Sequence, residues 1–313
     1  MSDLHVIFGA GPVGLATARE LVKAGERVRI INRSGKANVP AGVEVGAGDA
    51  SDPAQTRKLA EGASVIYFCV NPPYHEWAEK FPPMHTAILD AAIHVKAKMI
   101  SMENVYLYGE VDRPMTEDMP ANPNSKKGHV RAKMAQELMS AHQRGDVRAA
   151  IARASDFYGA GVLESALADR VFKPMLQGKA AQLVGNPDVP HTYTYMEDVG
   201  KALAILGRDD RALGQVWHVP NAPVTSAREV ITMAANIMGV EPKISVMGKL
   251  MLQMAGIFIP GAREMVEMLY EFDKPHIVDS SKFTRTFGVS ATPYREGLTT
   301  TIAWYKAHIA AGK

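Results

Sequence analysis

The first half of the chain alternates short apolar runs with amphipathic segments. The apolar runs predict β-strands at His5–Phe8, Val28–Ile31, Val43–Val45, Val65–Val70, Lys98–Ser101 and Ala149–Ala152. Between them, apolar residues recur at intervals of three and four, which predicts α-helices at Val13–Ala24, Pro53–Glu61, Met84–His94 and Lys127–His142. Strands that alternate with helices build parallel sheets, so we expect an α/β fold with a doubly wound parallel sheet.

Composition and charge favour a soluble protein with a small-molecule partner. Of 313 residues, 47% are hydrophobic and 22% are charged, which is ordinary for a globular chain with a large core. The formal charge of +2 gives no reason to expect a nucleic acid or a membrane as partner. The only cysteine is Cys69, so an internal disulfide is excluded and a cytoplasmic location is expected. The apolar segment Leu250–Ile259 is too short to span a bilayer.

A glycine-rich segment, Gly9-Ala10-Gly11-Pro12-Val13-Gly14, joins the first predicted strand to the first predicted helix. Gly9 permits a sharp turn, Gly11 lets the backbone approach a pyrophosphate, and Gly14 lets the helix pack closely on the strand. The helix N-terminus offers unpaired N–H groups to phosphate, and Pro12 is tolerated in the first helical turn. The segment therefore predicts a Rossmann-type dinucleotide site; a tight turn without a ligand is the alternative. The expected contacts are Gly9, Gly11, Pro12, Val13 and Gly14.

The residues after the second strand bear on the choice between NAD and NADP. They read Asn32-Arg33-Ser34 and contain no acid that would accept a hydrogen bond from the ribose. Arg33 can form paired hydrogen bonds with a 2′-phosphate, and Asn32 and Ser34 can donate to it. We therefore expect NADP(H) in preference to NAD(H), with a solvated surface arginine as the alternative.

Further cofactor contacts are expected after the third and fourth strands. Asp49, with Ala50 beside it, can bind the adenine edge or cap the helix that begins near Pro53. Val70 and Asn71 end the fourth strand, where the carboxyl edge of a parallel sheet faces its ligand.

Several segments of the second half follow one another in a recognisable order. They are Arg153–Gly159, Tyr193–Val199, Gly214–Val219, Asp279–Phe283, Phe287-Gly288 and Glu296-Gly297-Leu298. The chain as a whole resembles the extended short-chain dehydrogenase/reductases, the group that includes NAD-dependent epimerases and dehydratases. The resemblance implies a Rossmann-type NAD(P)-binding domain at 1–157 with returning segments near 191–220 and 276–285. A smaller substrate lobe would then be formed mainly by 158–190 and 221–313.

The resemblance also assigns roles to residues outside the glycine turn. It implies that Ala154 and Ser155 contact the cofactor. The expected substrate contacts are Tyr74, Asp156, Phe157, Tyr158 and His191.

The helix that carries the family's chemistry departs from the family pattern. The family has a catalytic tyrosine and a lysine four residues apart, and the matching residues in this chain are His129 and Lys133. In the family, the tyrosine exchanges a proton with the substrate oxygen and the lysine holds the nicotinamide ribose. Lys133 keeps that second role. His129 can supply a proton near neutral pH, or it only caps or lines the site.

The loop after the fifth strand resembles the family segment that contains a catalytic serine, but the serine itself is displaced. Depending on the alignment, its place falls on Met102 or on Asn104. Asn104 or Ser101 can donate a hydrogen bond to a carbonyl oxygen, and Tyr106 or Tyr108 can replace the missing phenol. A structural role is the alternative for each of them.

These features predict an NADP(H)-dependent oxidoreductase or isomerase that acts on a small organic carbonyl, enone or sugar-like substrate. A non-catalytic NADP(H)-binding regulator is the alternative, because the resemblance also covers relatives that keep the fold without the tyrosine. No metal site is expected, since no histidine has a second ligand at suitable spacing. The resemblance implies a homodimer through Met84–His94 and Lys127–His142. The Met-rich stretch Ser245–Phe272 predicts core or dimer packing.

Overall fold

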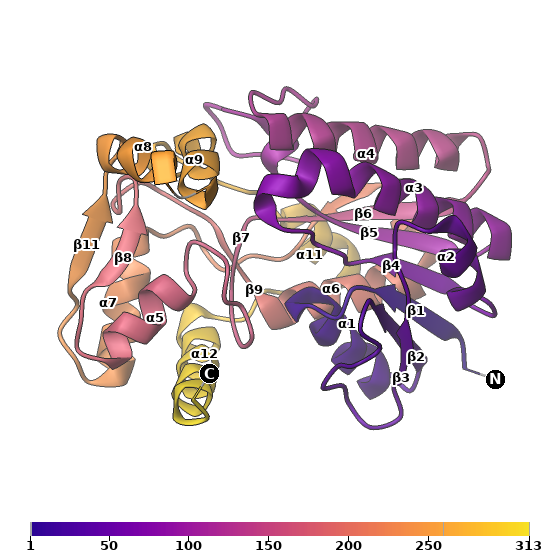
Figure 1. Ribbon diagram of the computed structural model, residues 1–313, viewed down its shortest axis with the longest axis horizontal. Helices are drawn as coiled ribbons and strands as arrows, with labels where there is room; N and C mark the ends of the chain where they lie inside the picture. The colour runs from indigo at the N-terminus through magenta and orange to yellow at the C-terminus, as the bar shows by residue number, and fades with distance from the viewer. Residues whose placement is uncertain (1, 259, 313) are drawn as a thin grey trace. The chain divides into compact units, whose positions relative to one another are not determined.

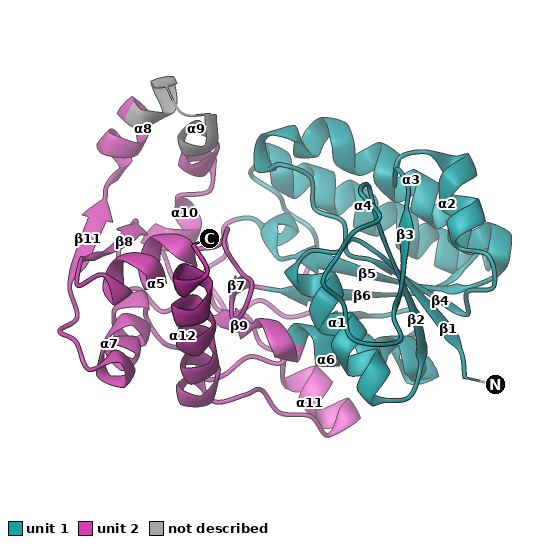
Figure 2. Ribbon diagram, turned by 60° about the horizontal axis from the view of Figure 1, so that its bottom comes forward, with its two compact units in different colours: residues 1–109, 120–154, 199–219 teal, residues 110–119, 155–198, 220–313 magenta. Residues whose placement is uncertain are grey.

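A parallel sheet forms the centre of unit 1, which comprises residues 1–109, 120–154 and 199–219 (Figure 2). The computed structural model describes residues 2–258 and 260–312, with the side chains of 255–263 left out. The seven strands of this sheet lie in the order β10-β6-β5-β4-β1-β2-β3. Their bounds are β1 Leu4–Phe8, β2 Arg27–Asn32, β3 Glu44–Ala47, β4 Val65–Phe68, β5 Lys98–Asn104, β6 Arg148–Ala154 and β10 Val216–His218. The order reverses between β1 and β4, so their carboxyl ends form the crevice where such sheets bind ligands.

Helices cover both faces of this sheet (Figure 1). α1 (Pro12–Lys23) packs against α6 (Met196–Arg208) so closely that a Cβ on Gly200 would meet the backbone of Ala16. α3 (Trp77–Val95) and α4 (Lys126–Gln143) lie on the opposite face, and α2 (Pro53–Leu59) packs beside α3. They bury an apolar core that includes Phe68, Phe81 and Leu138. The predicted doubly wound α/β fold is confirmed.

Helix α3 begins seven residues earlier than its predicted start at Met84. Proline removes a backbone donor and usually ends a helix, so Pro82 and Pro83 concealed the first two turns from the apolar spacing. Burial of Trp77 and Phe81, at 5% and 0% exposure, offsets the lost hydrogen bonds. The other helices and strands of this half lie within a few residues of their predicted bounds.

Unit 2 comprises residues 110–119, 155–198 and 220–313. Two short parallel strand pairs belong to it: β7 (Asp156–Tyr158) with β9 (Tyr193–Tyr195), and β8 (Ala181–Val184) with β11 (Ile244–Met247). Its main core lies among α5 (Asp169–Leu176), α7 (Ala227–Met238) and α12 (Tyr294–Ala310), and includes Phe172, Ile231 and Tyr305. The remaining helices are α8 Lys249–Phe258, α9 Pro260–Glu267, α10 Tyr270–Asp273 and α11 Ser281–Phe287.

Residues 191–198 and 276–285 group with unit 2 by their contacts, and the domain bounds that the resemblance implies stay a prediction. In α8, Leu250, Met251 and Met254 are 70%, 54% and 54% exposed, whereas Leu252 is buried. The three exposed side chains therefore do not pack in the core of the unit, and dimer packing, the other part of the prediction, stays a prediction. Part of the predicted stretch, the side chains of 255–263, lies outside the described residues. Among the helices described, none combines the length and apolarity that a bilayer crossing requires.

Candidate functional site

The glycine-rich turn lies between the carboxyl end of β1 and the start of α1. Gly9 has φ +115°, and a Cβ there would overlap the carbonyl oxygen of Cys69 just beyond β4. A Cβ on Gly14 would overlap the carbonyl oxygen of Gly9. Both positions therefore require glycine for steric reasons, as the spacing predicts.

Gly11 differs from the other two glycines because its surroundings are open. Chain neighbours aside, no described atom lies within 4 Å of a Cβ built on it. Gly11 is also the N-cap of α1 and has no side chain to satisfy the first N–H groups, while Pro12 occupies the first turn. An exposed, uncapped helix N-terminus at the sheet's switch point is suited to a pyrophosphate. The residues present thus fit the dinucleotide that the sequence predicts.

The segment after β2 is a tight loop held by its own side chains. Asn32 Nδ2 donates to the carbonyl oxygen of Lys36 at 2.9 Å, and Asn32 Oδ1 accepts from the N–H of Gly35 at 2.7 Å. The Ser34 hydroxyl bonds to Asn32 Oδ1 at 3.2 Å. Asn32 therefore stabilises the loop through its own side chain. Arg33 is exposed and interacts electrostatically with Asp49 and Glu76.

Asp49 does not cap the following helix. The cap of α2 is Asp52, whose Oδ1 accepts from the N–H groups of Ala54 at 2.9 Å and Gln55 at 3.2 Å. Asp49 accepts instead from the N–H and the hydroxyl of Ser51, and these bonds hold the pKa of Asp49 below its ordinary value. The capping interpretation of Asp49 is therefore wrong, and its carboxylate stays at the edge of the sheet beside the buried Ala50.

Helix α4 presents two different faces. His129 and Lys133 lie on an exposed face, with the Lys133 side chain 70% exposed and its Nζ 4.0 Å from Glu137. Lys127 and Arg131 lie on the buried face, where the Arg131 guanidinium stacks over Phe81 at 4.1 Å. His129 does not cap the helix, because the Ser125 hydroxyl accepts from the Gly128 N–H as N-cap. The two residues that match the family's pair are thus accessible together.

The end of β5 and the loop after it hold a buried polar network in unit 1. The Tyr108 hydroxyl is 2.8 Å from His218 Nε2 and accepts from Arg153 Nη1 at 2.8 Å. Arg153 Nε also donates to Glu103 at 3.3 Å, and burial raises the pKa of Glu103. Tyr108 is fully buried, so its hydroxyl ties β5, β6 and β10 together.

The remaining candidates at the end of β5 are Asn104, Tyr106 and Ser101, and each has different surroundings. Asn104 Oδ1 accepts from the N–H of Tyr106 at 3.3 Å, and the Tyr106 ring stacks on Trp77. Ser101 is buried, and within the described part of the chain its hydroxyl has no hydrogen-bond partner. Trp77 is 5% exposed and donates to the carbonyl oxygen of Pro72, so it belongs to the core.

The predicted substrate residues of unit 2 are Asp156, Phe157, Tyr158 and His191. Asp156 and His191 meet, with His191 Nε2 2.9 Å from Asp156 Oδ2. Tyr158 is fully buried in a stack with Tyr195 and Tyr294. Phe157 is half-buried beside Asp156 on β7.

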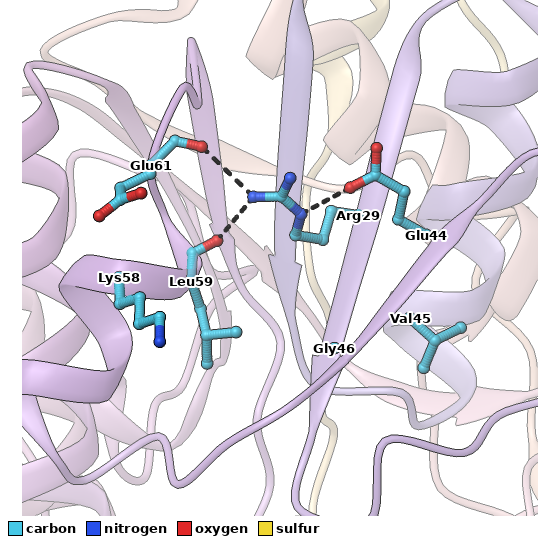
Figure 3. Close-up of a pocket in the computed structure, with 7 residues that line it drawn as sticks. All are labelled: Arg29, Glu44, Val45, Gly46, Lys58, Leu59 and Glu61. Atoms are coloured by element: carbon cyan, nitrogen blue, oxygen red, sulfur yellow. Dashed lines mark hydrogen bonds and ion pairs between the residues drawn. The ribbon is translucent and has the colours of Figure 1, made fainter.

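A pocket of about 370 Å³ lies beside β2 and the edge strand β3, and no residue of the glycine turn lines it (Figure 3). Arg29 Nε donates to Glu44 at 2.8 Å there, and its Nη1 donates to the carbonyl oxygens of Leu59 and Glu61. Arg29 therefore ties the end of α2 to the sheet. None of the predicted site residues lines this pocket.

The chain matches a family model over residues 6–219 of 313, that of the NAD dependent epimerase/dehydratase family. The chain belongs to this family. The resemblance inferred from the sequence is thereby confirmed, and the chain is an enzyme of a family that uses a nicotinamide cofactor. The search of curated proteins returned no match.

Solved structures of sugar-nucleotide enzymes share the fold. UDP-glucuronic acid 4-epimerase from Bacillus cereus, solved with UDP-glucuronic acid and NAD, is 18% identical with a TM-score of 0.79 and covers 97% of this chain and 99% of its own. UDP-glucose 4-epimerase from Thermotoga maritima, solved with UDP-glucose, is 15% identical with a TM-score of 0.80 and coverages of 98% and 99%. dTDP-glucose 4,6-dehydratase from Bacillus anthracis, in complex with NAD, is 14% identical with a TM-score of 0.78 and coverages of 98% and 97%. At these identities, the likeness establishes the fold.

Sequence reasoning missed four buried polar residues that the structure brings to the site regions. Glu103 and Arg131 lie in unit 1, and Glu271 and His276 lie in unit 2. Alternation along β5 places Glu103 on the same face as Ser101, which was the one available signal. His276 and Glu271 lie 120 and 115 residues beyond Asp156 in the sequence, and no local pattern links them to it.

Proposed function

We propose that this chain is an NADP(H)-dependent oxidoreductase or isomerase acting on a small organic carbonyl, enone or sugar-like substrate. The observation that carries the proposal is the glycine turn, where two glycines are sterically required and the third leaves the N-terminus of α1 open. Family membership supports a nicotinamide dinucleotide as the ligand of this turn.

The preference for NADP(H) rests on Arg33. No acid follows β2 to accept from the 2′-hydroxyl, and Arg33 is exposed at that place. The structural relatives from B. cereus and B. anthracis were solved with NAD. The proposed preference for NADP(H) therefore rests on the side chains of this chain alone. Arg33 would pair with the 2′-phosphate, and Asp49 with Ala50 would border the adenine. Val70, Asn71, Ala154 and Ser155 would line the remainder of the dinucleotide.

The chemistry of the bound cofactor is hydride transfer at the nicotinamide. Lys133 would hold the nicotinamide ribose through its exposed ammonium group. His129, one turn earlier on the same exposed face, and Asn104 at the end of β5 are the candidates from unit 1 for contact with the substrate oxygen. Tyr74, Asp156, Phe157 and His191 are the substrate contacts we propose outside that helix.

Two properties of the assembly also remain proposals. We propose a homodimer through α3 and α4, where Ile93 is 38% exposed. The single cysteine favours a cytoplasmic location.

A turnover screen tests the proposed activity. NADPH consumption is followed by absorbance with a panel of aldehydes, ketones, enones and sugars, using wild type and Lys133→Ala. We expect at least one compound to be reduced by wild type, and Lys133→Ala to reduce both cofactor affinity and turnover. If no compound consumes NADPH and Lys133→Ala weakens only cofactor binding, the non-catalytic regulator is supported instead.

A further inference from the structure

The buried face of α4 carries two cations, Lys127 and Arg131. They lie four residues apart, so they are neighbours on one face of the helix. Lys127 is 3% exposed and Arg131 is 6% exposed. Cationic side chains are seldom buried to this extent unless negative charge or hydrogen-bond acceptors meet them.

Aromatic rings contact both cations. Lys127 Nζ lies 4.3 Å from the centroid of the Tyr74 ring. The guanidinium carbon of Arg131 lies 4.7 Å from the centroid of Trp77 and 4.1 Å from that of Phe81. Ring faces attract a cation, but they leave its N–H groups without a conventional acceptor. Within the described residues, Nε and Nη1 of Arg131 are buried and have no hydrogen-bond partner.

Two polar side chains of β5 face the same side of the sheet. Ser101 pairs in register with Phe68 of β4, whose ring lies 6.1 Å from that of Phe81 on α3. Neighbours in a parallel register point to the same side, so Ser101 faces α3, and Glu103 follows two residues later. In the described part of the chain, Ser101 Oγ and Glu103 Oε1 are also buried without a hydrogen-bond partner. Phe81 thus lies between these groups and Arg131.

The buried charges of unit 1 do not balance. Among its described residues, the buried cations are Lys127, Arg131 and Arg153, whereas Glu103 is the only buried acid. Burial raises the pKa of Glu103, and its Oε2 already accepts from Arg153 at 3.3 Å. Burial lowers the pKa of Arg131 to about 10, so this guanidinium stays charged near neutral pH. Buried positive charge therefore exceeds buried negative charge in this part of the unit.

The other ionisable neighbours of Arg131 supply no buried negative charge. Burial and then the charge of Arg131 lower the pKa of His85 to about 4, so its imidazole is neutral near pH 7. Glu137 Oε2 lies 3.4 Å from His85 Nδ1, but the Glu137 side chain is 40% exposed and also lies 4.0 Å from Lys133. Solvent therefore screens its charge.

These cations lie at the carboxyl ends of β4 and β5, in the same unit as the glycine turn. Tyr74 follows β4 by six residues and Tyr106 follows β5 by two. Both tyrosines are half-buried and contact Trp77, so the cluster reaches the surface at these two loops. A Cβ on Gly128 would overlap the carbonyl oxygen of Tyr106, which holds the start of α4 against the second loop. Parallel α/β sheets bind their ligands at this edge.

We propose that Arg131, Lys127 and Ser101 bind an oxyanion of the substrate, either a carboxylate or a phosphate. The proposal deepens the proposed function, on which the role of this oxyanion as part of a substrate rests. Guanidinium and ammonium groups donate charge-assisted hydrogen bonds to both kinds of oxygen, and the serine hydroxyl adds a neutral donor. These contacts come from the buried face of α4, whereas His129 and Lys133 lie on its exposed face.

The binding test titrates the protein with oxalate and with inorganic phosphate, each with and without NADP⁺, by calorimetry. The variants are Arg131→Met and Lys127→Met, and Lys126→Met is the matched control because Lys126 is exposed in the same turn of α4. We expect wild type to bind at least one probe saturably. Both variants should bind it about tenfold more weakly or worse, and Lys126→Met should stay within about twofold of wild type.

The two probes distinguish the sources of the oxyanion. Tighter binding of oxalate indicates a carboxylate on the substrate, and tighter binding of phosphate indicates a phosphate. Wild type that binds neither probe under either condition overturns the proposal. Wild-type affinity in both Arg131→Met and Lys127→Met overturns it as well.

Urea unfolding separates binding from a structural role. A probe that binds only the folded protein raises the unfolding midpoint. We expect this rise in wild type and Lys126→Met but not in Arg131→Met, whatever the midpoint without the probe. Lys127→Met supplies the same comparison if Arg131→Met does not fold. Variants that are less stable but show the full rise would mean that the cations only support the fold, which overturns the proposal. Failure of the proposed function is distinct, because it appears as absence of NADPH binding to wild type.

Discussion

The glycine turn of unit 1 and a cluster of side chains in unit 2 are built on opposite principles. This cluster, here called the Asp156 cluster, consists of Asp156, His191, Glu271 and His276. The turn consists of six consecutive residues, and its shape is decided by backbone overlap at Gly9 and Gly14. The Asp156 cluster joins side chains that lie far apart in the sequence, from Asp156 to His276. In the proposed function, the turn would bind its ligand through N–H groups that any helix start supplies, whereas the cluster depends on burial and on the charge of each side chain.

The two sites also differ in how they tolerate substitution. In this chain, the backbone limits substitution at Gly9 and Gly14 of the turn. The proton-transferring group needs only a correctly placed acid, and more than one element can supply it. In this chain, the sequence resemblance matches His129 on α4 to the family's tyrosine, and Asp156 is the first residue of β7.

The largest expected effect comes from comparing Gly14→Val with Gly11→Ala, which distinguishes the role of the turn in stability from its role in cofactor binding. The first adds atoms where a Cβ overlaps a backbone oxygen, and it should cost about 1–3 kcal/mol or more in unfolding free energy. We expect it to weaken NADPH binding by at least about 100-fold, close to 3 kcal/mol. Gly11→Ala should unfold like wild type and still bind NADPH about tenfold more weakly. Denaturant unfolding and fluorescence titration measure both. Wild-type affinity in Gly11→Ala would mean that the turn holds no pyrophosphate.

The two units can be compared through one buried neutral histidine in each. Burial lowers the pKa of His276 to about 3 and that of His85 to about 4. Because these pKa values lie below the unfolded value of about 6.5, stability is lost as pH falls below about 6.5. Between about pH 6.5 and about pH 4.5, each histidine should contribute about 2 kcal/mol of that loss.

His276→Gln and His85→Gln should therefore flatten the dependence of unfolding free energy on pH, apart from a constant offset. Urea unfolding at a series of pH values measures the slope. An unchanged slope in His276→Gln would show that the Asp156 cluster does not bury a neutral imidazole.

The next effect concerns the cofactor's phosphate. Arg33→Ala should weaken NADPH binding about tenfold, equivalent to about 1.4 kcal/mol, and leave NADH binding unchanged. Lys23→Ala is the matched control, since Lys23 is an exposed cation of the same unit with its partner on the same helix. Calorimetric titration of both cofactors distinguishes the variants. Equal losses of affinity for NADPH and NADH in Arg33→Ala would show that Arg33 does not bind the 2′-phosphate.

The smallest expected effect concerns Asp52, the N-cap of α2. Asp52→Ala removes two hydrogen bonds from the start of α2 and should cost about 1 kcal/mol. Asp49→Ala should leave the unfolding free energy near that of wild type, because the Asp49 carboxylate accepts from the N–H and hydroxyl of Ser51 within its own turn. The reverse order of stabilities would restore Asp49 as the cap.

The parts predicted from the sequence are those that depend on neighbouring residues. The spacing Gly9, Gly11, Gly14 and the alternation of strands with helices are local, so they predicted the turn and the sheet. Helix α3 was shortened because Pro82 and Pro83 oppose a helix locally, and only the burial of Trp77 and Phe81 shows why it continues. The exposed face of α8 was missed because Met and Leu carry the same signal whether or not a partner covers them.

The candidate site shows the same limit. Asp156 and His191 were predicted separately as substrate contacts, but their pairing and the buried Glu271 and His276 behind them depend on the folding of four distant segments. The position of Arg131 over Phe81 on the buried face of α4 could not be predicted, because arginine side chains usually face solvent.

The measurement that tests the central claim most directly is a paired titration of wild type with NADPH and NADH, followed by intrinsic fluorescence. The account predicts saturable binding of NADPH at least about tenfold tighter than that of NADH. Equal or tighter binding of NADH would contradict the role of Arg33, and binding of neither cofactor would contradict the assignment of the glycine turn.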